Sequence, residues 1–144
     1  MEIKRIKDPQ LFISVEAKKI FDNLRELDEF KTLDNKDLFM LAVVFGYKTG
    51  KGRELKSKDK TESGFTRERY LSDSDNCILK AIAIKHDNKV DVIRDIQRVY
   101  SIAEEYANEG VYHLKDFVFS NPASFAKKYA EQVKAAESIE WTSD

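Results

Sequence analysis

Hydrophobic residues are most concentrated at positions 38–45, where eight consecutive residues carry no polar side chain. Positions 48–52 then read KTGKG, which makes the chain abruptly polar and flexible. The central methionine, leucine and alanine of the apolar run favour a helix over the alternative, a short buried strand. A helix that is apolar on every side has to be surrounded by other elements. We therefore predict a buried central helix, capped by Asp34 or Asn35, that leads into a basic loop.

Three other segments show the repeat of about 3.6 residues that is typical of an amphipathic helix. They lie at 13–27, 92–107 and 125–136. Their apolar stripes consist of Ile13, Ala17, Ile20, Leu24 and Leu27, of Val92, Ile96, Val99, Ala103 and Tyr106, and of Phe125, Tyr129, Val133 and Ala136. Each stripe predicts a helix that packs on the core through one face.

Capping residues indicate where the helices begin. Asp8 followed by Pro9 fits a cap with proline in the first turn, and Ser14 is the alternative start of the first helix. Residues 72–75 read SDSD, close to a capping box, and predict another helix that runs to about residue 85. The inner face of that helix is expected to consist of Ile78, Ala81 and Ile82.

Together these elements predict an all-α protein, a single compact domain over residues 1–144 with five or six helices. Gly110 stands where a left-handed glycine would end the helix over 92–107. The segment 111–119 that follows fits either a helix or a strand. One short β element is expected near the N-terminus or in the basic loop, and the tail from about residue 138 is expected to be frayed.

Composition and charge limit the classes of protein to which this chain can belong. The chain has 144 residues, of which 42% are hydrophobic and 35% are charged, and its net charge is −1. It is therefore not basic throughout, and any contact with nucleic acid has to come from local charge. The first ten residues lack the apolar core of a signal peptide, and no apolar run approaches the roughly 20 residues that span a bilayer. We expect a cytoplasmic protein without membrane contact.

Positions 48–69 form the longest stretch without apolar periodicity. They contain eight basic and four acidic residues, a local excess of positive charge. The basic residues are Lys48, Lys51, Arg53, Lys56, Lys58, Lys60, Arg67 and Arg69. A structureless loop of this length is uncommon in a compact domain unless it is functional or mobile.

Motifs for enzymatic chemistry are incomplete in this sequence. The segment 46–51, GYKTGK, has three residues between its glycines, whereas a phosphate-binding P-loop needs four. His86 and His113 lie on different predicted elements, and nothing near them completes a metal site or an acid–base pair. Cys77 precedes an isoleucine and a leucine, so it is expected to be a buried, inert thiol. We predict no catalytic site, no cofactor and no metal ion, and hence a non-enzymatic protein.

The basic loop at 48–69 supports one functional hypothesis, a contact with the phosphates of DNA. Lysines and arginines on a glycine-containing loop can follow a nucleic-acid backbone and gain affinity from counterion release. The predicted contact residues are Lys48, Lys51, Arg53, Lys56, Arg67 and Arg69. No recognition helix or zinc finger accompanies them, so reading of a specific base sequence is not predicted. A solvated connection without a function is the alternative.

A second hypothesis is a helical adaptor or oligomerisation module that does not bind nucleic acid. The stripe over 92–107 is widened by Ile93, Tyr100 and Ala107 beyond what its own core would need. Residues 101–144 contain eight acidic residues and four lysines, so their charge is opposite to that of the loop. Opposite charges at two places allow self-association or a protein partner.

Three segments also resemble a known family. They read LFMLAVVFGYKTGKGREL, ERYLSDSDNCILKAIAI and VYSIAEEYANEGVYHL. Over about residues 35–114 the chain resembles small dnd-system-associated proteins, which are encoded beside bacterial DNA-phosphorothioation genes. The shared features are an apolar helix ending in a G-Y-K-x-G element, a later short helix and an IAEEYAN-G helix end.

This resemblance implies an accessory role in a bacterial or archaeal DNA-modification or phage-defence system. It brings no catalytic residue with it. Only Gly46, Tyr47, Lys48 and Gly50 map onto the shared G-Y-K-x-G element.

Overall fold

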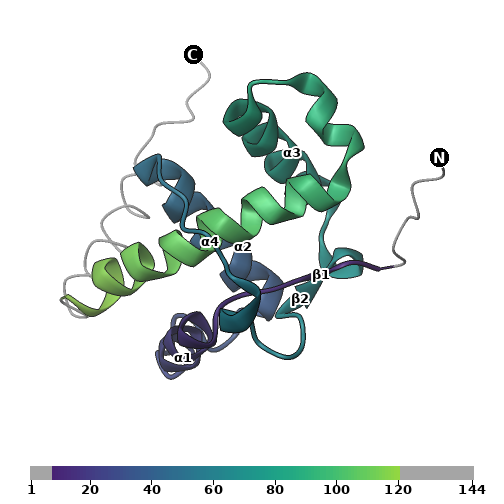
Figure 1. Cartoon of the computed structure of the whole chain (residues 1–144). Coiled ribbons are helices and arrows are strands. Elements are labelled where there is room, and N and C mark those ends of the chain that lie inside the picture. Colours follow the sequence, from purple (N-terminus) through teal and green to yellow (C-terminus); the bar gives the residue numbers. More distant parts are fainter. Residues whose placement is uncertain (1–7, 121–144) are drawn as a thin grey trace, which may run out of the picture. The chain divides into compact units, whose positions relative to one another are not determined.

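A computed structural model describes residues 8–120, and these residues fold mainly into helices (Figure 1). The helices are α1 (Val15–Leu24), α2 (Asn35–Thr49), α3 (Asp73–Asp87) and α4 (Ile96–Phe119), with the short 3₁₀ helices η1 (Ser57–Asp59), η2 (Glu68–Tyr70) and η3 (Val90–Arg94). The strands β1 (Gln10–Leu11) and β2 (Thr66–Arg67) form a two-stranded antiparallel sheet. The predicted mostly α-helical fold with one short β element is confirmed.

The chain divides into two compact units, Met1–Leu114 and Lys115–Asp144. The packing described below belongs to the first unit. The helix predicted over 125–136 and the tail from about residue 138 lie outside the described residues, so the total number of helices and the single domain stay predictions. No helix within residues 8–120 is long and apolar enough to cross a membrane.

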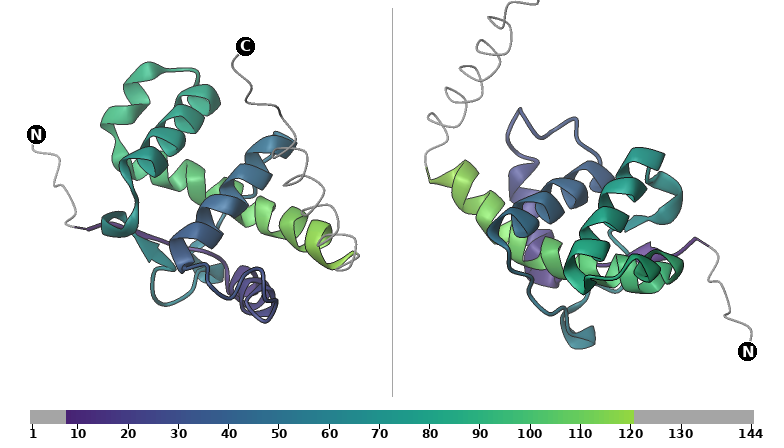
Figure 2. Two further views of the ribbon diagram at one scale, coloured as in Figure 1. Left: turned by 180° about the vertical axis from the view of Figure 1, so that it is seen from behind. Right: turned by 90° about the horizontal axis from the view of Figure 1, so that it is seen from above.

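Helices α2 and α4 cross with their backbones in close contact (Figure 1), and Figure 2 shows the crossing from behind and from above. A Cβ atom added at Gly110 would lie 1.7 Å from the carbonyl oxygen of Ala42, and one added at Gly46 would lie 2.0 Å from that of Tyr106. Neither position has room for a side chain. The prediction that Gly110 ends a helix is wrong, because this glycine serves the crossing and α4 continues through it to Phe119.

Helix α2 forms where the apolar run predicts a helix, but it is not surrounded on every side, because Val44 is 43% exposed. Its buried residues are Leu38, Phe39, Met40, Ala42, Val43 and Gly46. Most of the stripe predicted over 92–107 is buried on α4, including the extra residues Tyr100 and Ala107, whereas the third extra residue, Ile93, lies in η3 and is 37% exposed. Since the fold itself covers the α4 part of the stripe, the width of that part does not indicate a partner.

Local capping signals set the starts of α2 and α3 as predicted. The side chain of Asp34 accepts a hydrogen bond from the backbone N–H of Asp37 (2.9 Å), and Ser72 does the same for Asp75 (3.0 Å). In both cases the second carboxylate accepts from the backbone of the first residue, which completes a capping box.

Helix α1 begins at Ser14, the alternative start, and not at Asp8 and Pro9. The Oγ atom of Ser14 accepts a hydrogen bond from the backbone N–H of Ala17 (3.0 Å). Asp8 has a positive φ of 54°, and β1 follows Pro9. The predicted proline start is wrong because pairing with β2 keeps this segment extended.

Helix α3 turns a different face inward from the one predicted. Its buried residues are Leu79, Ile82 and Ala83, whereas Ile78 is 43% exposed. Cys77 is exposed, so the prediction of a buried thiol is wrong. The short apolar pattern fits two neighbouring helix faces, and contacts from distant parts of the chain select between them.

Candidate nucleic-acid interface

The first half of the basic segment is an arm, residues 50–60, that leaves α2 and passes across α4 (Figure 1). It begins at Gly50, whose left-handed φ of 74° ends α2. The backbone N–H of Arg53 then donates to the carbonyl oxygen of Glu105 in α4 (2.9 Å). The arm is therefore attached to α4 by its backbone, and it is not a structureless loop.

Asn108 is the main side-chain attachment of the arm. It is only 5% exposed, and its Nδ2 atom donates to the carbonyl oxygens of Arg53 (3.3 Å) and Glu54 (3.1 Å). A buried amide that bonds two successive backbone carbonyls fixes the path of the chain at that point. The arm thus presents its side chains from a held backbone.

The second half of the segment is attached to the N-terminal part of the chain. Lys60 forms an isolated bridge with Ser14, and the backbone N–H of Phe65 donates to Leu11 (2.8 Å). In the sheet, Arg67 pairs with Gln10. Positions 60–67 therefore run antiparallel to the chain around β1, which local sequence patterns did not predict.

The three arginines among the predicted contact residues all lie beside carboxylates from outside the segment. Arg53 Nε lies 2.7 Å from Glu109, and its guanidinium lies 4.2 Å from the ring centre of Tyr112. Arg67 and Arg69 lie 3.7 Å and 3.5 Å from the same carboxylate oxygen of Asp8. These pairs offset part of the arginine charge.

The three lysines among the predicted contact residues are in a different situation. Lys48, Lys51 and Lys56 are exposed, and no carboxylate of residues 8–120 lies within 4.0 Å of their ammonium groups. Lys48 lies in the last turn of α2, where a positive charge is favourable for the helix dipole. The lysines are thus the part of the predicted site whose charge is available to a ligand.

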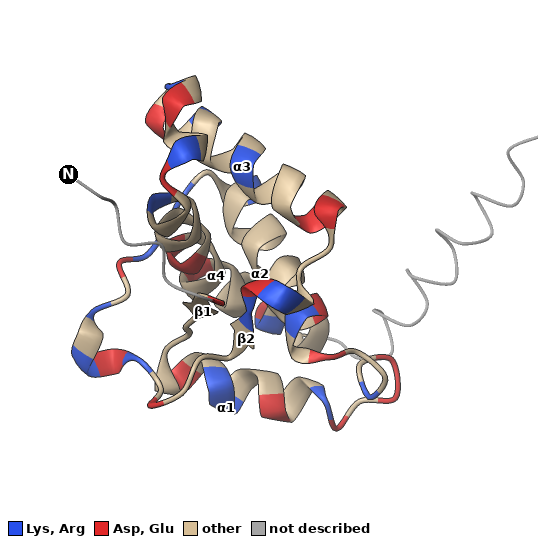
Figure 3. Cartoon of the chain, turned by 90° about the vertical axis from the view of Figure 1, so that its right-hand side faces the viewer, with Lys and Arg blue, Asp and Glu red and all other residues tan. Residues whose placement is uncertain are grey.

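The charge around them is mixed. Figure 3 shows blue and red segments interspersed along the described chain, and no face in that view is blue throughout. The arm itself contains the exposed residues Glu54 and Asp59. The lysines therefore lie on the arm and at the end of α2 that leads into it, and they do not form a broad basic surface.

Residues of α4 that the sequence pattern did not single out hold Arg53 in place. The carboxylate of Glu109 accepts from Arg53 and also lies 3.2 Å from Nε2 of His113. Burial raises the pKa of Glu109, but the hydrogen bond and charge of Arg53 outweigh it, so the pKa lies below its ordinary value. The hydroxyl of Tyr112 donates to Glu16 (2.6 Å), and burial and this bond raise the pKa of Tyr112.

Glu104 is a buried carboxylate that ties the N-terminal segment to α4. It is 9% exposed, and its Oε2 accepts a hydrogen bond from the backbone N–H of Phe12 (2.6 Å). Burial raises the pKa of Glu104 although this hydrogen bond acts in the opposite direction. Glu104 and Asn108 lie one turn apart on α4 and hold the two segments that flank it.

The histidines have separate partners in the structure. His86 Nδ1 lies 2.9 Å from Asp87, and the ring of His86 stands edge-on to that of Tyr106. Arg98 donates two hydrogen bonds to Asp87 (3.0 and 2.8 Å), and these, with His86, hold the pKa of that carboxyl well below its ordinary value. Within residues 8–120 no group of three or more His, Cys, Asp and Glu side chains could hold a metal ion.

One comparison with known proteins identifies a family. A family model described as DNA sulphur modification system-associated protein 4 matches residues 11–138, well over half of the chain. The chain belongs to this family. No curated protein and no solved structure matches it.

Membership of the DNA sulphur modification system-associated family confirms the resemblance drawn from the sequence and assigns the chain to an accessory component of such a system. The structure accounts for two of the three features behind that resemblance. The G-Y-K-x-G element supplies Gly46 to the helix crossing, and the IAEEYAN-G segment supplies Gly110 together with Glu104 and Asn108. Both motifs are therefore parts of one packing arrangement around α4.

Proposed function

We propose that this accessory protein contacts DNA phosphates through its arm and the neighbouring basic residues, and that it is not an enzyme. The observation that carries the proposal is a set of three exposed lysines beside a backbone that Asn108 holds. No carboxylate of residues 8–120 lies within 4.0 Å of Lys48, Lys51 or Lys56. The family description, which places the chain in a DNA modification system, agrees with the proposal. A cytoplasmic location is part of the same proposal.

The chemistry of the contact is electrostatic. Each lysine that neutralises a phosphate releases condensed counterions, so affinity falls as salt rises. The logarithm of the association constant falls by about 0.9 per contact for each unit increase in the logarithm of the salt concentration. Arg53, Arg67 and Arg69 are half-exposed, and each already lies beside a carboxylate. Each can contact a phosphate only if its guanidinium binds the carboxylate and the phosphate together, or leaves the carboxylate for the phosphate. The lysines are therefore expected to make most of the phosphate contacts. Binding is expected to be weak and independent of base sequence.

A salt series with duplex DNA tests this proposal. Replacing Lys48, Lys51 and Lys56 by glutamine should weaken binding and reduce the salt slope by about 2 to 3. The matched control replaces three other exposed lysines, Lys19, Lys85 and Lys89, and removes the same charge from other elements. Duplexes with and without phosphorothioate linkages should both be used, because the family is named for DNA sulphur modification.

Two results would count against the proposal. Wild-type protein that binds neither duplex at low salt would remove DNA as the partner. A control variant that loses as much affinity as the arm variant would show that only net charge matters and that the arm is not the contact.

An adaptor function is the second candidate, and a surface other than α4 now supports it. Ile78 on α3 and Val90 and Ile93 on η3 are 43%, 66% and 37% exposed. Light scattering of the purified protein tests this candidate. A dimer that Ile78→Ser converts to a monomer would favour it, and a strict monomer at all concentrations would count against self-association.

A further inference from the structure

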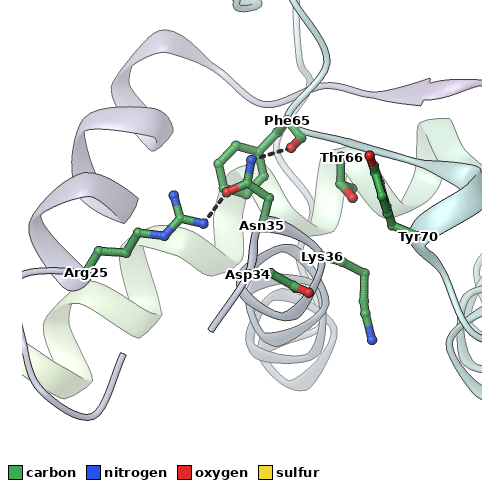
Figure 4. Close-up of a pocket in the computed structure, with 7 residues that line it drawn as sticks. All are labelled: Arg25, Asp34, Asn35, Lys36, Phe65, Thr66 and Tyr70. Atoms are coloured by element: carbon green, nitrogen blue, oxygen red, sulfur yellow. Dashed lines mark hydrogen bonds between the residues drawn. The ribbon is translucent and has the colours of Figure 1, made fainter. Parts of the chain in front are cut away.

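A cleft lies between the end of α1, the start of α2 and the segment 61–70 (Figure 4). It consists of two adjoining cavities of about 380 and 430 Å³. Arg25, Asn35 and Phe65 line both cavities, so these three residues form the shared floor. Cavities of about 300 to 1,000 Å³ are typical of sites for small molecules.

Arg25 is held in this cleft by neutral groups. Its Nη2 donates to the Oδ1 atom of Asn35, and Nδ2 of Asn35 donates to the carbonyl oxygen of Phe65 (2.7 Å) (Figure 4). The guanidinium also lies 5.9 Å from the ring centre of Phe65. Arg25 is therefore fixed in position with most of its donors unused.

Three of the other charged residues that line the cleft, Lys36, Lys18 and Asp34, have partners close by. Lys36 lies 2.9 Å from Asp75, and Lys18 lies 3.2 Å from Asp22. The Asp34 carboxylate accepts from the N–H of Asp37, so the start of α2 is already capped and is not what draws a ligand. Among the cations that line the cleft, Arg25 alone has no carboxylate of residues 8–120 within 4.0 Å.

Tyr70 lines the first cavity on the side away from Arg25 (Figure 4). It is 57% exposed, even though Arg69 approaches its ring centre to 5.0 Å. The cleft therefore holds an exposed aromatic ring and a fixed guanidinium that pairs with no carboxylate of residues 8–120. The two suit a ligand that has a planar group at one end and an oxyanion at the other. Each cavity has one acidic residue in its lining, Asp34 in the first and Glu62 in the second. The Asp34 carboxylate already accepts from the N–H of Asp37, and Lys36 lines the same cavity, so the anionic end belongs on the Arg25 and Lys36 side.

We propose that this cleft binds a nucleoside monophosphate group, with the phosphate on Arg25 and the base against Tyr70. The group has two sources, a free nucleotide or the phosphorylated end of a nucleic-acid strand. The site is separate from the arm lysines and does not rest on their binding duplex DNA. Arg25 binds the phosphate directly, and Asn35 is a positioning residue.

Titration calorimetry of the full chain tests the proposal with four probes, namely AMP, inorganic phosphate, and a short single strand with or without a 5′-phosphate. AMP or the phosphorylated strand should bind more tightly than inorganic phosphate. Arg25→Gln should weaken that binding by about tenfold or more, and Tyr70→Leu should remove the preference over inorganic phosphate. Arg94→Gln is the matched control, because Arg94 is exposed and likewise has no carboxylate of residues 8–120 within 4.0 Å.

The thermal transition of each variant is measured alongside. If Arg25→Gln fails to fold, Arg25→Lys is used instead. Lysine keeps the charge but lacks the planar guanidinium that can donate two parallel hydrogen bonds, so Arg25→Lys should still weaken binding. Binding of the phosphorylated strand but not of AMP would support the proposal and identify a strand end as the source. The proposal is overturned if no probe binds, if inorganic phosphate binds as well as AMP and the phosphorylated strand do, or if Arg25→Gln and Arg94→Gln behave alike.

Discussion

Replacing Gly110 by alanine is expected to destabilise the protein strongly, although alanine is the better helix former. The added Cβ would lie 1.7 Å from the Ala42 carbonyl oxygen and 2.5 Å from the Gly46 backbone nitrogen. Ordinary contact is at about 3.5 Å, so α2 and α4 would have to separate by roughly 1.8 Å at this point. Overpacking of this kind costs about 1 to 3 kcal/mol or more, and the gain in helix propensity is at most about 1 kcal/mol.

Because the clashing atoms belong to backbone and cannot rotate away, the cost should lie at the upper end of that range. We expect a net loss of about 2 to 3 kcal/mol in the free energy of unfolding, measured by urea denaturation with circular dichroism. Gly52→Ala is the control, since its Cβ would meet Glu105 at an ordinary 3.4 Å. If Gly110→Ala is as stable as Gly52→Ala, the close crossing of α2 and α4 is refuted.

Three further predictions concern the other contacts of α4 and the start of α3. Burial raises the pKa of Glu104, so its contribution to stability is complete below its ordinary pKa of 4.5 and is lost as the pH rises through the folded-state pKa. Relative to Glu104→Gln, the wild type should therefore lose stability in urea unfolding as the pH rises from 4.5 through the folded-state pKa of Glu104. A difference in stability between the two proteins that stays constant with pH would contradict this. Asn108→Ala should cost about 1 to 3 kcal/mol and accelerate amide exchange in the arm, and unchanged exchange would exclude the attachment. Ser72→Ala should cost about 1 kcal/mol in the same unfolding assay, whereas Ser74→Ala, in the exposed first turn of α3, should be neutral.

Features that depend on neighbouring residues could be predicted from the sequence. The capping boxes at Asp34 and Ser72 involve residues three positions apart. The apolar run of α2 predicts a largely buried helix without any knowledge of the elements that pack on it. Ser14 was identified as a possible start of α1 for the same reason. In each case the physical cause lies within one or two turns of chain.

Features that depend on distant residues could not be predicted in this way. Gly110 fits a helix end as well as a helix crossing, and only the approach of Ala42 decides between the two. The partners of Arg53 and Arg69 lie 56 and 61 positions away along the chain, so their ion pairing is invisible to local patterns. As a result the basic segment could be identified as charged, but its division into paired arginines and available lysines could not.

An NMR titration shows whether the lysines beside and within the arm contact DNA phosphates. Isotope-labelled protein is titrated with a short duplex at low salt, and the backbone amide shifts are followed residue by residue. We expect the largest shifts in residues 48–58, and we expect these shifts to become smaller as salt is added. Shifts confined to α3 and η3, or no shifts at all at low salt, would contradict this expectation.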